Sequence, residues 1–221
     1  MKGSIVGLIP VKGSSDRVKK KNLRDFAGSS LLEVKLNQLK DAKGFENIIV
    51  SSEDDEVLNI AKKHGFSTHI RDPKYSTSEV PMSDVYSYIA SEIEGDNIAW
   101  INVTNPLAET IIYNKAVELY NDIDSSYDCL LSSILLQENV FYEGLPVNFT
   151  PYPWPKSQDL KGLNSLTFVI NILKRKDMVS WGSCVGNAPY FYDLDKIDSW
   201  DIDDQADFEF CEFIYKKRIN K

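Results

Sequence analysis

Short apolar runs alternate with segments of helical periodicity along most of the chain. The apolar runs predict buried strands and the periodic segments predict helices. The predicted strands are Ser4–Pro10, Ile48–Ser51, Ser67–Ile70, Ile98–Val103, Tyr127–Leu136, Leu166–Ile172 and Pro189–Leu194. The predicted helices are Leu31–Leu39, Asp54–His64, Ser83–Glu94, Ile111–Asn121, Lys176–Trp181 and Ala206–Lys217. This alternation predicts an α/β fold, a mostly parallel sheet with helices on both faces.

One stretch, Val140–Lys161, interrupts the alternation and is rich in proline and aromatic residues. It is too aromatic for a flexible linker, which favours an ordered insertion, about residues 138–165, that packs on a neighbour such as a second subunit. A local loop that covers the edge of the sheet fits the same composition. The length of 221 residues is typical of one domain, so we expect a single domain, residues 1–221, that carries this insertion.

Composition excludes several classes of protein. With 43% hydrophobic residues the chain is globular, and none of its apolar runs is long enough for a membrane span. A net charge of −8 argues against a nucleic-acid partner, since binding there requires the neutralisation of many phosphates. Three widely spaced cysteines and a first segment unlike a signal peptide predict a cytoplasmic protein with reduced thiols.

The acidic chain contains one basic segment, the loop Val11–Asn22, which follows the first predicted strand. Lys12, Arg17 and Lys21 suit a polyphosphate, Gly13 permits close approach of the backbone, and Ser14 and Ser15 add small hydrogen-bond donors. The loop has neither the P-loop pattern nor the dinucleotide-binding glycine pattern. A solvated charged loop is the alternative, but ligands of such sheets bind beyond the carboxyl ends of the strands, which favours a phosphate site.

A cluster of carboxylates lies near the end of the chain. In an extended segment Asp201 and Asp203 point to the same side, and two carboxylates together with substrate phosphates suit Mg²⁺. The alternative is that these acids cap the last helix, for which Asp204 and Asp207 are the better placed. A basic loop and a two-carboxylate metal site together indicate nucleotidyl transfer, in which positioning and electrostatics carry most of the catalysis.

With these motifs in order, the chain resembles the acylneuraminate cytidylyltransferase family, of the CMP-sialic-acid synthetase type. The similarity runs along nearly the whole chain, and no single motif carries it. The matching segments are Ile9–Asp16 with Lys21–Asn22, Phe26–Leu31, Val50–Glu56, Arg71–Asp84, Ile101–Ala108, Ser199–Asp203 and Asp207–Phe208.

The resemblance implies a Rossmann-like sheet of the nucleotidyltransferase type and a Mg²⁺-dependent enzyme. This enzyme would join CTP to a 2-keto-3-deoxy sugar acid and release pyrophosphate. It also implies a homodimer in which the inserted segment reaches the partner's sugar site. By position, the expected nucleotide-binding residues are Lys12, Gly13, Ser14, Arg17, Lys21, Asn22 and Ser78, and the expected sugar-binding residues are Asn102, Gln158 and Asn171. The expected metal ligands are Asp201 and Asp203, which with Lys12 and Lys21 form the expected catalytic set.

The chain also departs from the family pattern. Lys12 replaces an arginine, Ser14 a glycine, Asp16 a lysine, Asn102 a glutamine and Ala108 an arginine. Loss of the arginine fork weakens bidentate phosphate binding, and the sugar-facing half matches less well than the nucleotide-facing half. Two alternatives stay open: a nucleotidyltransferase for another nucleotide or acceptor, and a non-catalytic nucleotide-binding homologue.

Overall fold

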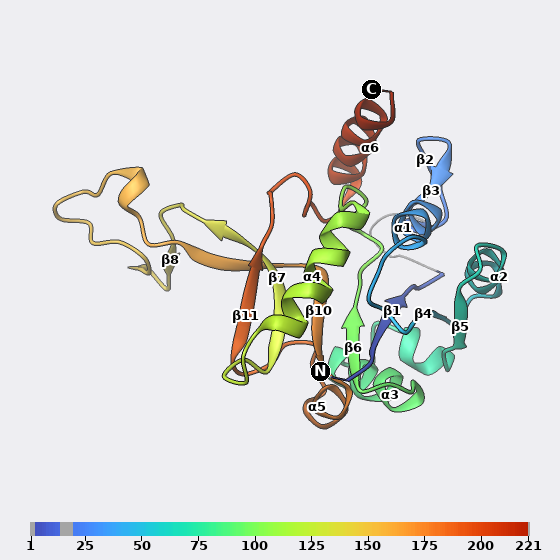
Figure 1. Cartoon of the computed structure of the whole chain (residues 1–221). Coiled ribbons are helices and arrows are strands. Elements are labelled where there is room, and N and C mark those ends of the chain that lie inside the picture. Colours follow the sequence, from blue (N-terminus) through green and yellow to red (C-terminus); the bar gives the residue numbers. More distant parts are fainter. Residues whose placement is uncertain (1–2, 14–19, 221) are drawn as a thin grey trace.

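The structure, a computed structural model, describes residues 3–13 and 20–220, and a seven-stranded sheet forms its centre (Figure 1). The strands run in the order β11-β7-β10-β6-β1-β4-β5. Their bounds are β1 Ile5–Pro10, β4 Asn47–Ser52, β5 Ser67–Ile70, β6 Asn97–Trp100, β7 Cys129–Leu136, β10 Leu163–Lys174 and β11 Pro189–Asp193. Only β10 is antiparallel to its neighbours, β6 and β7, so the expected mostly parallel sheet is confirmed.

Helices cover both faces of the sheet, as the alternation of elements predicts. Their bounds are α1 Leu31–Leu39, α2 Asp55–Lys63, α3 Met82–Glu92, α4 Thr110–Asp122, α5 Arg175–Trp181 and α6 Gln205–Ile219, with a 3-10 turn η1 at Pro73–Ser76. Apolar side chains of α3 and α5 pack on one face. Those of α1, α2, α4 and α6 pack on the other. Among the described residues, no helix combines the length and the apolarity that crossing a membrane requires.

The central strand β1 shows why an uninterrupted apolar run predicts a strand buried on both faces. Successive side chains of a strand point to opposite faces of the sheet. Ile5 and Ile9 accordingly join the core under α1, while Val6 and Leu8 join the core under α3. The carboxyl end of β1, and the basic loop that follows it, therefore lie near the middle of the row of strand ends on one side of the sheet.

Capping residues determine where two of the helices begin or end. Helix α1 has exactly the predicted bounds, and Ser30 is its N-cap: the Ser30 hydroxyl accepts the Glu33 amide at 3.2 Å. Helix α2 begins after Asp54, whose side chain accepts the Glu56 amide at 2.8 Å. Gly65, at a φ of +83°, ends the same helix in the left-handed conformation that glycine adopts without strain.

Three local features differ from the sequence prediction. Strand β6 ends at Trp100, before the predicted end at Val103, and Asn102 and Val103 line a cavity instead. A small hairpin, β2 (Asp25–Phe26) with β3 (Ser29–Ser30), was not predicted. Strand β10 is longer than predicted and contains a register shift between Leu166 and Asn171.

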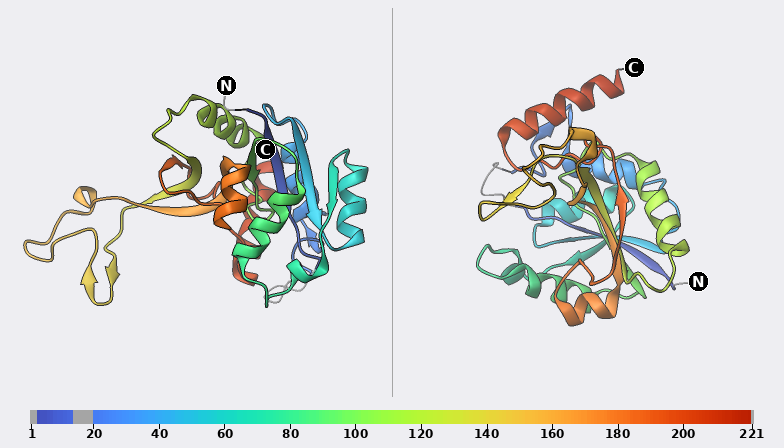
Figure 2. Two further views of the ribbon diagram at one scale, coloured as in Figure 1. Left: turned by 90° about the horizontal axis from the view of Figure 1, so that it is seen from below. Right: turned by 90° about the vertical axis from the view of Figure 1, so that its left-hand side faces the viewer.

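The inserted segment between β7 and β10, residues 137–162, projects from the body as an arm (Figure 1 and the left panel of Figure 2). It holds the hairpin β8 (Phe141–Tyr142) and β9 (Leu145–Pro146) and the 3-10 turn η2 (Ser157–Asp159). Buried Asn148 ties its base together by donating to the carbonyls of residues 138 and 161 at 2.8 and 2.9 Å. The arm extends away from the sheet, so the alternative of a loop covering the sheet edge is wrong.

Candidate functional site

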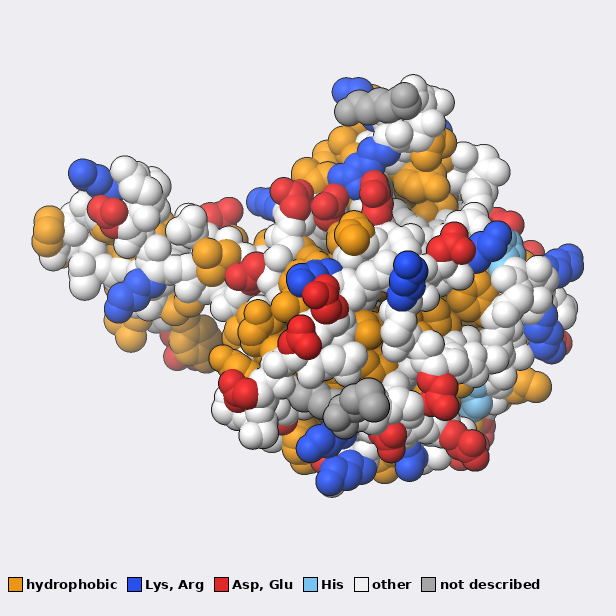
Figure 3. Space-filling model, in the orientation of Figure 1, with side chains coloured by type: hydrophobic (Ala, Val, Ile, Leu, Met, Phe, Trp, Pro, Cys, Tyr) orange, Lys and Arg blue, Asp and Glu red, His pale blue; other side chains and the backbone are white. Residues whose placement is uncertain are grey.

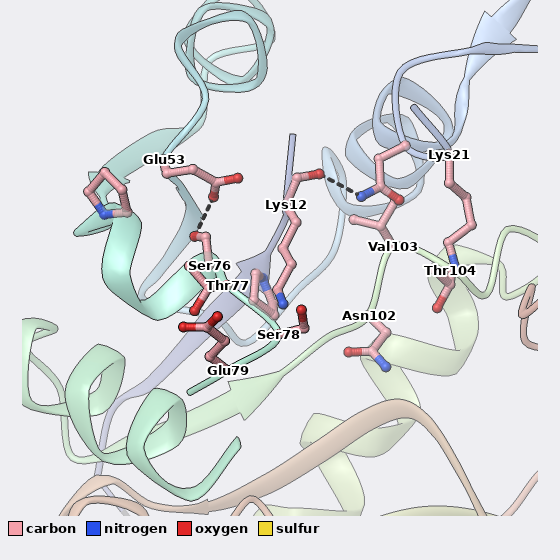
Figure 4. Close-up of a pocket in the computed structure, with 13 residues that line it drawn as sticks. Lys12, Lys21, Glu53, Ser76, Thr77, Ser78, Glu79, Asn102, Val103 and Thr104 are labelled. Atoms are coloured by element: carbon pink, nitrogen blue, oxygen red, sulfur yellow. Dashed lines mark hydrogen bonds between the residues drawn. The ribbon is translucent and has the colours of Figure 1, made fainter. Parts of the chain in front are cut away.

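A cavity of 740 Å³ lies at the carboxyl ends of β1, β4 and β6 (Figure 4). Its lining residues come from the loops that follow these strands and β5: Pro10, Lys12, Lys21, Asn22, Glu53, Pro73, Ser76, Thr77, Ser78, Glu79, Asn102, Val103 and Thr104. This is the edge where open α/β sheets bind their ligands. Five of the sequence-predicted site residues line it: Lys12, Lys21, Asn22, Ser78 and Asn102.

The described part of the basic loop is tightly built around Gly13. Its amide donates to Oε1 of Glu53 at 2.9 Å. A Cβ at this position would lie 2.0 Å from Oδ2 of Asp54, so only glycine fits without a shift of the Asp54 side chain. Asn22 closes the loop by donating to the Lys12 carbonyl at 3.0 Å. The predicted nucleotide-binding residues Ser14 and Arg17 lie outside the described residues.

Lys21 connects the basic loop to the carboxylate cluster. Its ammonium lines the cavity and donates to the carbonyl of Ile202 at 2.6 Å. The Ile202 amide in turn donates to the carbonyl of Thr104 at 2.9 Å. These bonds bring Asp201, on one side of Ile202, close to the basic loop. The two candidates of the sequence analysis are thus linked through Lys21, although neither Asp201 nor Asp203 is among the residues that line the cavity.

Asp201 stands in an environment that disfavours its negative charge. Burial raises the pKa of its carboxyl group, and the nearby charge of Asp203 adds to this; the Thr104 hydroxyl and the Lys21 ammonium oppose it. Oδ1 of Asp201 is buried and has no hydrogen-bond partner among the described residues. An orphaned carboxylate oxygen next to a second carboxylate is a suitable position for a cation.

The carboxylate pair fits a cation that keeps some of its waters. Across residues 3–13 and 20–220, no three side chains of the His, Cys, Asp and Glu types gather into a metal cluster. Mg²⁺ is commonly held by one or two carboxylates plus substrate phosphates, so a pair is a sufficient donor set. Asp204 and Asp207 have another role: they form the capping box of α6, as the alternative reading of this cluster predicted for them.

Glu53 and Arg71 organise the opposite wall of the cavity. The carboxylate of Glu53 accepts the Ser76 hydroxyl at 2.6 Å and lies 3.5 Å from the Arg71 guanidinium. Arg71 is 2% exposed and donates to the carbonyl of Val11, which follows β1, and to that of Ser51, near the end of β4. Burial lowers the pKa of this guanidinium, and Glu53 partly compensates. The pair therefore fixes three strand-end loops relative to one another.

Behind Asp201 lies a fully buried lysine, Lys35 of α1. Its ammonium donates to the carbonyl of Asn105 at 2.8 Å and to the Tyr113 hydroxyl. Asn105 donates from its own side chain to the carbonyls of Ser199 and Trp200 at 3.2 and 3.3 Å. Burial lowers the pKa of Lys35 to about 7, although the Asp201 charge acts in the opposite direction. This network joins α1 to the segment that carries Asp201.

Two predicted sugar-binding residues lie elsewhere. Gln158 is part of η2 in the arm and does not line the cavity of its own chain. Asn171 is buried in β10, paired with Trp100 of β6, and its amide donates to the sulfur of Cys184 at 3.6 Å. Only Asn102 of the three reaches the cavity.

Sequence reasoning missed the roles of Glu53, Arg71, Lys35 and Asn105. A signal existed for each of the first three. Glu53 and Arg71 each follow the last residue of a strand, which is where ligand-facing loops begin. Lys35 occupies the apolar face of α1 among leucines, where an unpaired charge is costly. Asn105 carried no such signal, because its partners come together only in the folded chain.

A family model described as cytidylyltransferase matches residues 6–144 of the chain, from β1 to the turn of the hairpin in the arm. The chain belongs to the cytidylyltransferase family. The match includes the basic loop, Glu53, Ser78 and Asn102, and it ends before the segment that carries Asp201 and Asp203.

The chain also matches named relatives at low identity, some of them named as cytidylyltransferases. The chain is 23% identical to the post-translational flagellin modification protein B of Campylobacter coli, over 97% of this chain and 96% of the relative. It is 26% identical to the pseudaminic acid cytidylyltransferase of Campylobacter jejuni over 54% of each. It is 25% identical to N-acylneuraminate cytidylyltransferase A of Danio rerio, over 94% of this chain but only 50% of the relative.

Solved structures of similar fold cover nearly the whole chain. A CMP:2-keto-3-deoxy-manno-octonic acid synthetase in complex with CTP superposes with a TM-score of 0.72 at 12% identity, over 97% of this cytidylyltransferase and 99% of that chain. A cytidylyltransferase of Leptospira borgpetersenii gives 0.65 at 18% identity, over 97% and 87%. At such identities the similarity establishes the nucleotidyltransferase fold alone.

Proposed function

We propose that this cytidylyltransferase transfers CMP from CTP to a hydroxyl of a 2-keto-3-deoxy sugar acid and releases pyrophosphate. The single observation that carries the proposal is the Lys21 bridge: Lys21 lines the cavity and donates to the carbonyl of Ile202, the residue between Asp201 and Asp203. The relatives named for pseudaminic acid and N-acylneuraminate support the sugar-acid class of acceptor. Neither this bridge nor the names of the relatives favours a non-catalytic binding role, in which a buried, unpartnered oxygen on Asp201 has no purpose.

In the proposed reaction the acceptor hydroxyl attacks the α-phosphorus of CTP in line with the departing pyrophosphate. The new bond joins the sugar oxygen to phosphorus, the bond from phosphorus to the pyrophosphate oxygen breaks, and the hydroxyl proton is released. Lys12 and Lys21 stabilise the charge that develops on the pyrophosphate. Ser78 and Asn22, both on the cavity wall, add hydrogen bonds to the nucleotide.

Asp201 and Asp203 are the residues that would hold Mg²⁺. When bound, this ion supplies Lewis-acid stabilisation of phosphate charge. The Asp201 carboxylate accepts a hydrogen bond from the Thr104 hydroxyl and is close enough to Lys21 to feel its charge. The Lys35 and Asn105 network holds the backbone of the same segment.

A pyrophosphate-release assay tests the proposed function. The purified protein is incubated with CTP, Mg²⁺ and a panel of 2-keto-3-deoxy sugar acids, and the same panel is repeated with UTP, GTP and ATP. We expect release with CTP and at least one sugar acid, and none when the acid is left out. Release that depends on another nucleotide would favour a different nucleotidyltransferase, and no release under any condition would favour a non-catalytic role.

We also propose that the arm forms a homodimer contact. Its aromatic and aliphatic side chains are largely open to solvent, with exposed fractions of 69% for Tyr142, 71% for Leu145 and 91% for Tyr152. Figure 3 shows hydrophobic side chains along the surface of the arm. Apolar patches of this kind mark protein interfaces. A partner's arm that covers the site would also bring Gln158 of that arm near the sugar acid.

Light scattering after size-exclusion chromatography tests the dimer. We expect the wild-type protein to have twice the mass of one chain, and Leu145→Glu with Tyr152→Glu to convert it to a monomer, because buried like charges oppose association. Phe213→Glu on α6, where the side chain is 58% exposed, is the matched control and leaves the mass unchanged. A wild-type monomer, or a dimer that the arm variant leaves intact, would contradict the proposal.

A further inference from the structure

Helix α1 holds the loop that follows β6 through two polar side chains. We call this loop, residues 101–109, the β6–α4 loop. The ammonium of Lys35 donates to the carbonyl of Asn105 at 2.8 Å. The side-chain amide of Gln38 donates to the carbonyl of Pro106 at 2.6 Å. Residues three apart lie on the same face of a helix, so one face of α1 binds two successive carbonyls of the loop.

The β6–α4 loop in turn holds the backbone on both sides of Asp201. The side-chain amide of Asn105 donates to the two carbonyls that precede Asp201, at 3.2 and 3.3 Å. The carbonyl of Thr104 accepts the amide of Ile202, the next residue after Asp201, at 2.9 Å. Because these three backbone groups are bound by two neighbouring loop residues, the position of Asp201 depends on the position of the loop.

The same helix is also bonded to the basic loop. The backbone amide of Leu32 donates to the carbonyl of Asn22 at 3.1 Å. Asn22 closes the basic loop by its bond to the Lys12 carbonyl. Helix α1 is therefore a short, stiff connection, with the basic loop bonded near its start and the β6–α4 loop bonded one turn later. This connection fixes the distance between the basic loop and the segment that carries Asp201.

Lys35 is the member of this connection that is most costly to bury. Its side chain is fully buried, and its ammonium is bound by the Asn105 carbonyl and the Tyr113 hydroxyl rather than by a carboxylate. A buried charge without an ion-pair partner lowers stability. Its neighbours Leu32 and Leu36 are apolar and equally buried, so packing alone does not require an ammonium here. A charge kept at this cost, and directed at the loop that holds Asp201, indicates a role in function.

We propose that Lys35 is a positioning residue for Asp201: through the β6–α4 loop and Asn105, it keeps the Asp201 carboxylate at a fixed distance from the basic loop. The inference rests on the proposed function, because it concerns a residue that would hold Mg²⁺. Lys35 does not line the cavity, so it acts on the reaction only through the backbone of residues 199–202. Loss of a group that orients a metal ligand costs about 10- to 100-fold in metal affinity or activity.

Hydrogen exchange of the Ile202 amide, followed by NMR on the protein without nucleotide or metal, tests the inference without turnover. Lys35→Met has a similar volume but cannot donate to the Asn105 carbonyl. We expect the Ile202 amide to exchange about tenfold faster or more in Lys35→Met, because the loop that binds this amide is released. The amides of β1 should exchange no faster than in the wild-type protein. A general loss of stability would accelerate both sets of amides.

Two further variants separate positioning from packing. Leu36→Val reduces the packing of α1 but removes no polar contact to the loop, so the exchange of Ile202 relative to β1 should be unchanged. Asn105→Ser keeps the carbonyl that Lys35 binds but loses the amide that holds the segment, and it should reproduce the effect of Lys35→Met. The double variant of Lys35 and Asn105 should exchange at most about twofold faster than the faster single variant, because both residues act through one chain of contacts.

Steady-state kinetics of pyrophosphate release supply the second readout. In Lys35→Met we expect kcat to fall about tenfold or more while KM for CTP changes less than about threefold, since the residues that line the cavity are intact. An Ile202 exchange rate that neither variant changes, or a change that β1 shares, would overturn the inference. Faster exchange with an unchanged kcat would do the same. If Lys35→Met does not fold, Asn105→Ser alone decides by the same criteria.

The failure of the proposed function is a separate result. If no sugar acid releases pyrophosphate from CTP with the wild-type protein, the proposed reaction is wrong. The exchange of the Ile202 amide then decides by itself whether Lys35 positions the segment that carries Asp201.

Discussion

Asp201→Asn should lower kcat for pyrophosphate release by about a thousandfold, the scale on which loss of a preorganised electrostatic group slows an enzyme. The asparagine keeps the shape of the side chain and can still accept the Thr104 hydroxyl, but it removes the charge that would hold the metal. CTP affinity without Mg²⁺ should change little. The measurement is steady-state kinetics at saturating CTP and acceptor, with Mg²⁺ varied.

The same substitution should not destabilise the fold. Burial and the Asp203 charge raise the pKa of Asp201, so its ionised form costs stability in the native state at neutral pH. Asp201→Asn should therefore melt at an equal or higher temperature in the absence of Mg²⁺. Asp204→Asn is the matched control: asparagine is as good an N-cap as aspartate, and activity should be kept. A kcat within tenfold of wild type in Asp201→Asn would contradict its assigned role.

Raising the pH from 7 to 9 should stabilise the wild-type protein by about 2 kcal/mol more than it stabilises Lys35→Met. Burial lowers the pKa of Lys35 to about 7, against 10.5 for a free lysine. Below pH 7 both the native and the unfolded chain carry the proton. Between pH 7 and 10.5 the unfolded chain binds it and the native chain does not, so the free energy of unfolding rises with pH in that window.

Urea unfolding at pH 7 and pH 9 measures this difference. Groups that do not interact with Lys35 titrate alike in both proteins and cancel in the comparison. Lys40→Met, at the exposed end of the same helix, is the control and should keep the wild-type pH dependence. Equal pH dependence in wild type and Lys35→Met would show that the buried ammonium keeps an ordinary pKa.

The hydrophobic pattern predicts most of the fold because strands and helices of this sheet are buried along their length. Leu31–Leu39 and Ser67–Ile70 have the predicted bounds exactly. The prediction of strand bounds fails where buried apolar residues belong to a loop. Ile101 and Val103 are buried but lie after the end of β6, so their apolarity is not evidence for a strand. Two-residue strands such as those of the arm are too short to produce any period.

The site could be predicted where its functional residues lie close together in the sequence. The basic loop and the carboxylate cluster are each local, and the strand order places both at one edge of the sheet. The buried links between them are not local: Asn105 meets the carbonyls of Ser199 and Trp200 across more than ninety positions of sequence. Gln158 shows a second limit of the prediction. Its position in the sequence assigned it to sugar binding by resemblance to the family, but in the structure it lies in the arm and does not line the cavity of its own chain.

The most direct measurement of the central claim is identification of the product by mass spectrometry and phosphorus NMR after incubation with CTP, Mg²⁺ and a sugar acid. We expect a CMP-sugar, formed in equal amount with pyrophosphate, that is absent with Asp201→Asn. Release of orthophosphate in place of pyrophosphate, or unchanged CTP with every sugar acid, would contradict the proposal that this cavity transfers a cytidylyl group.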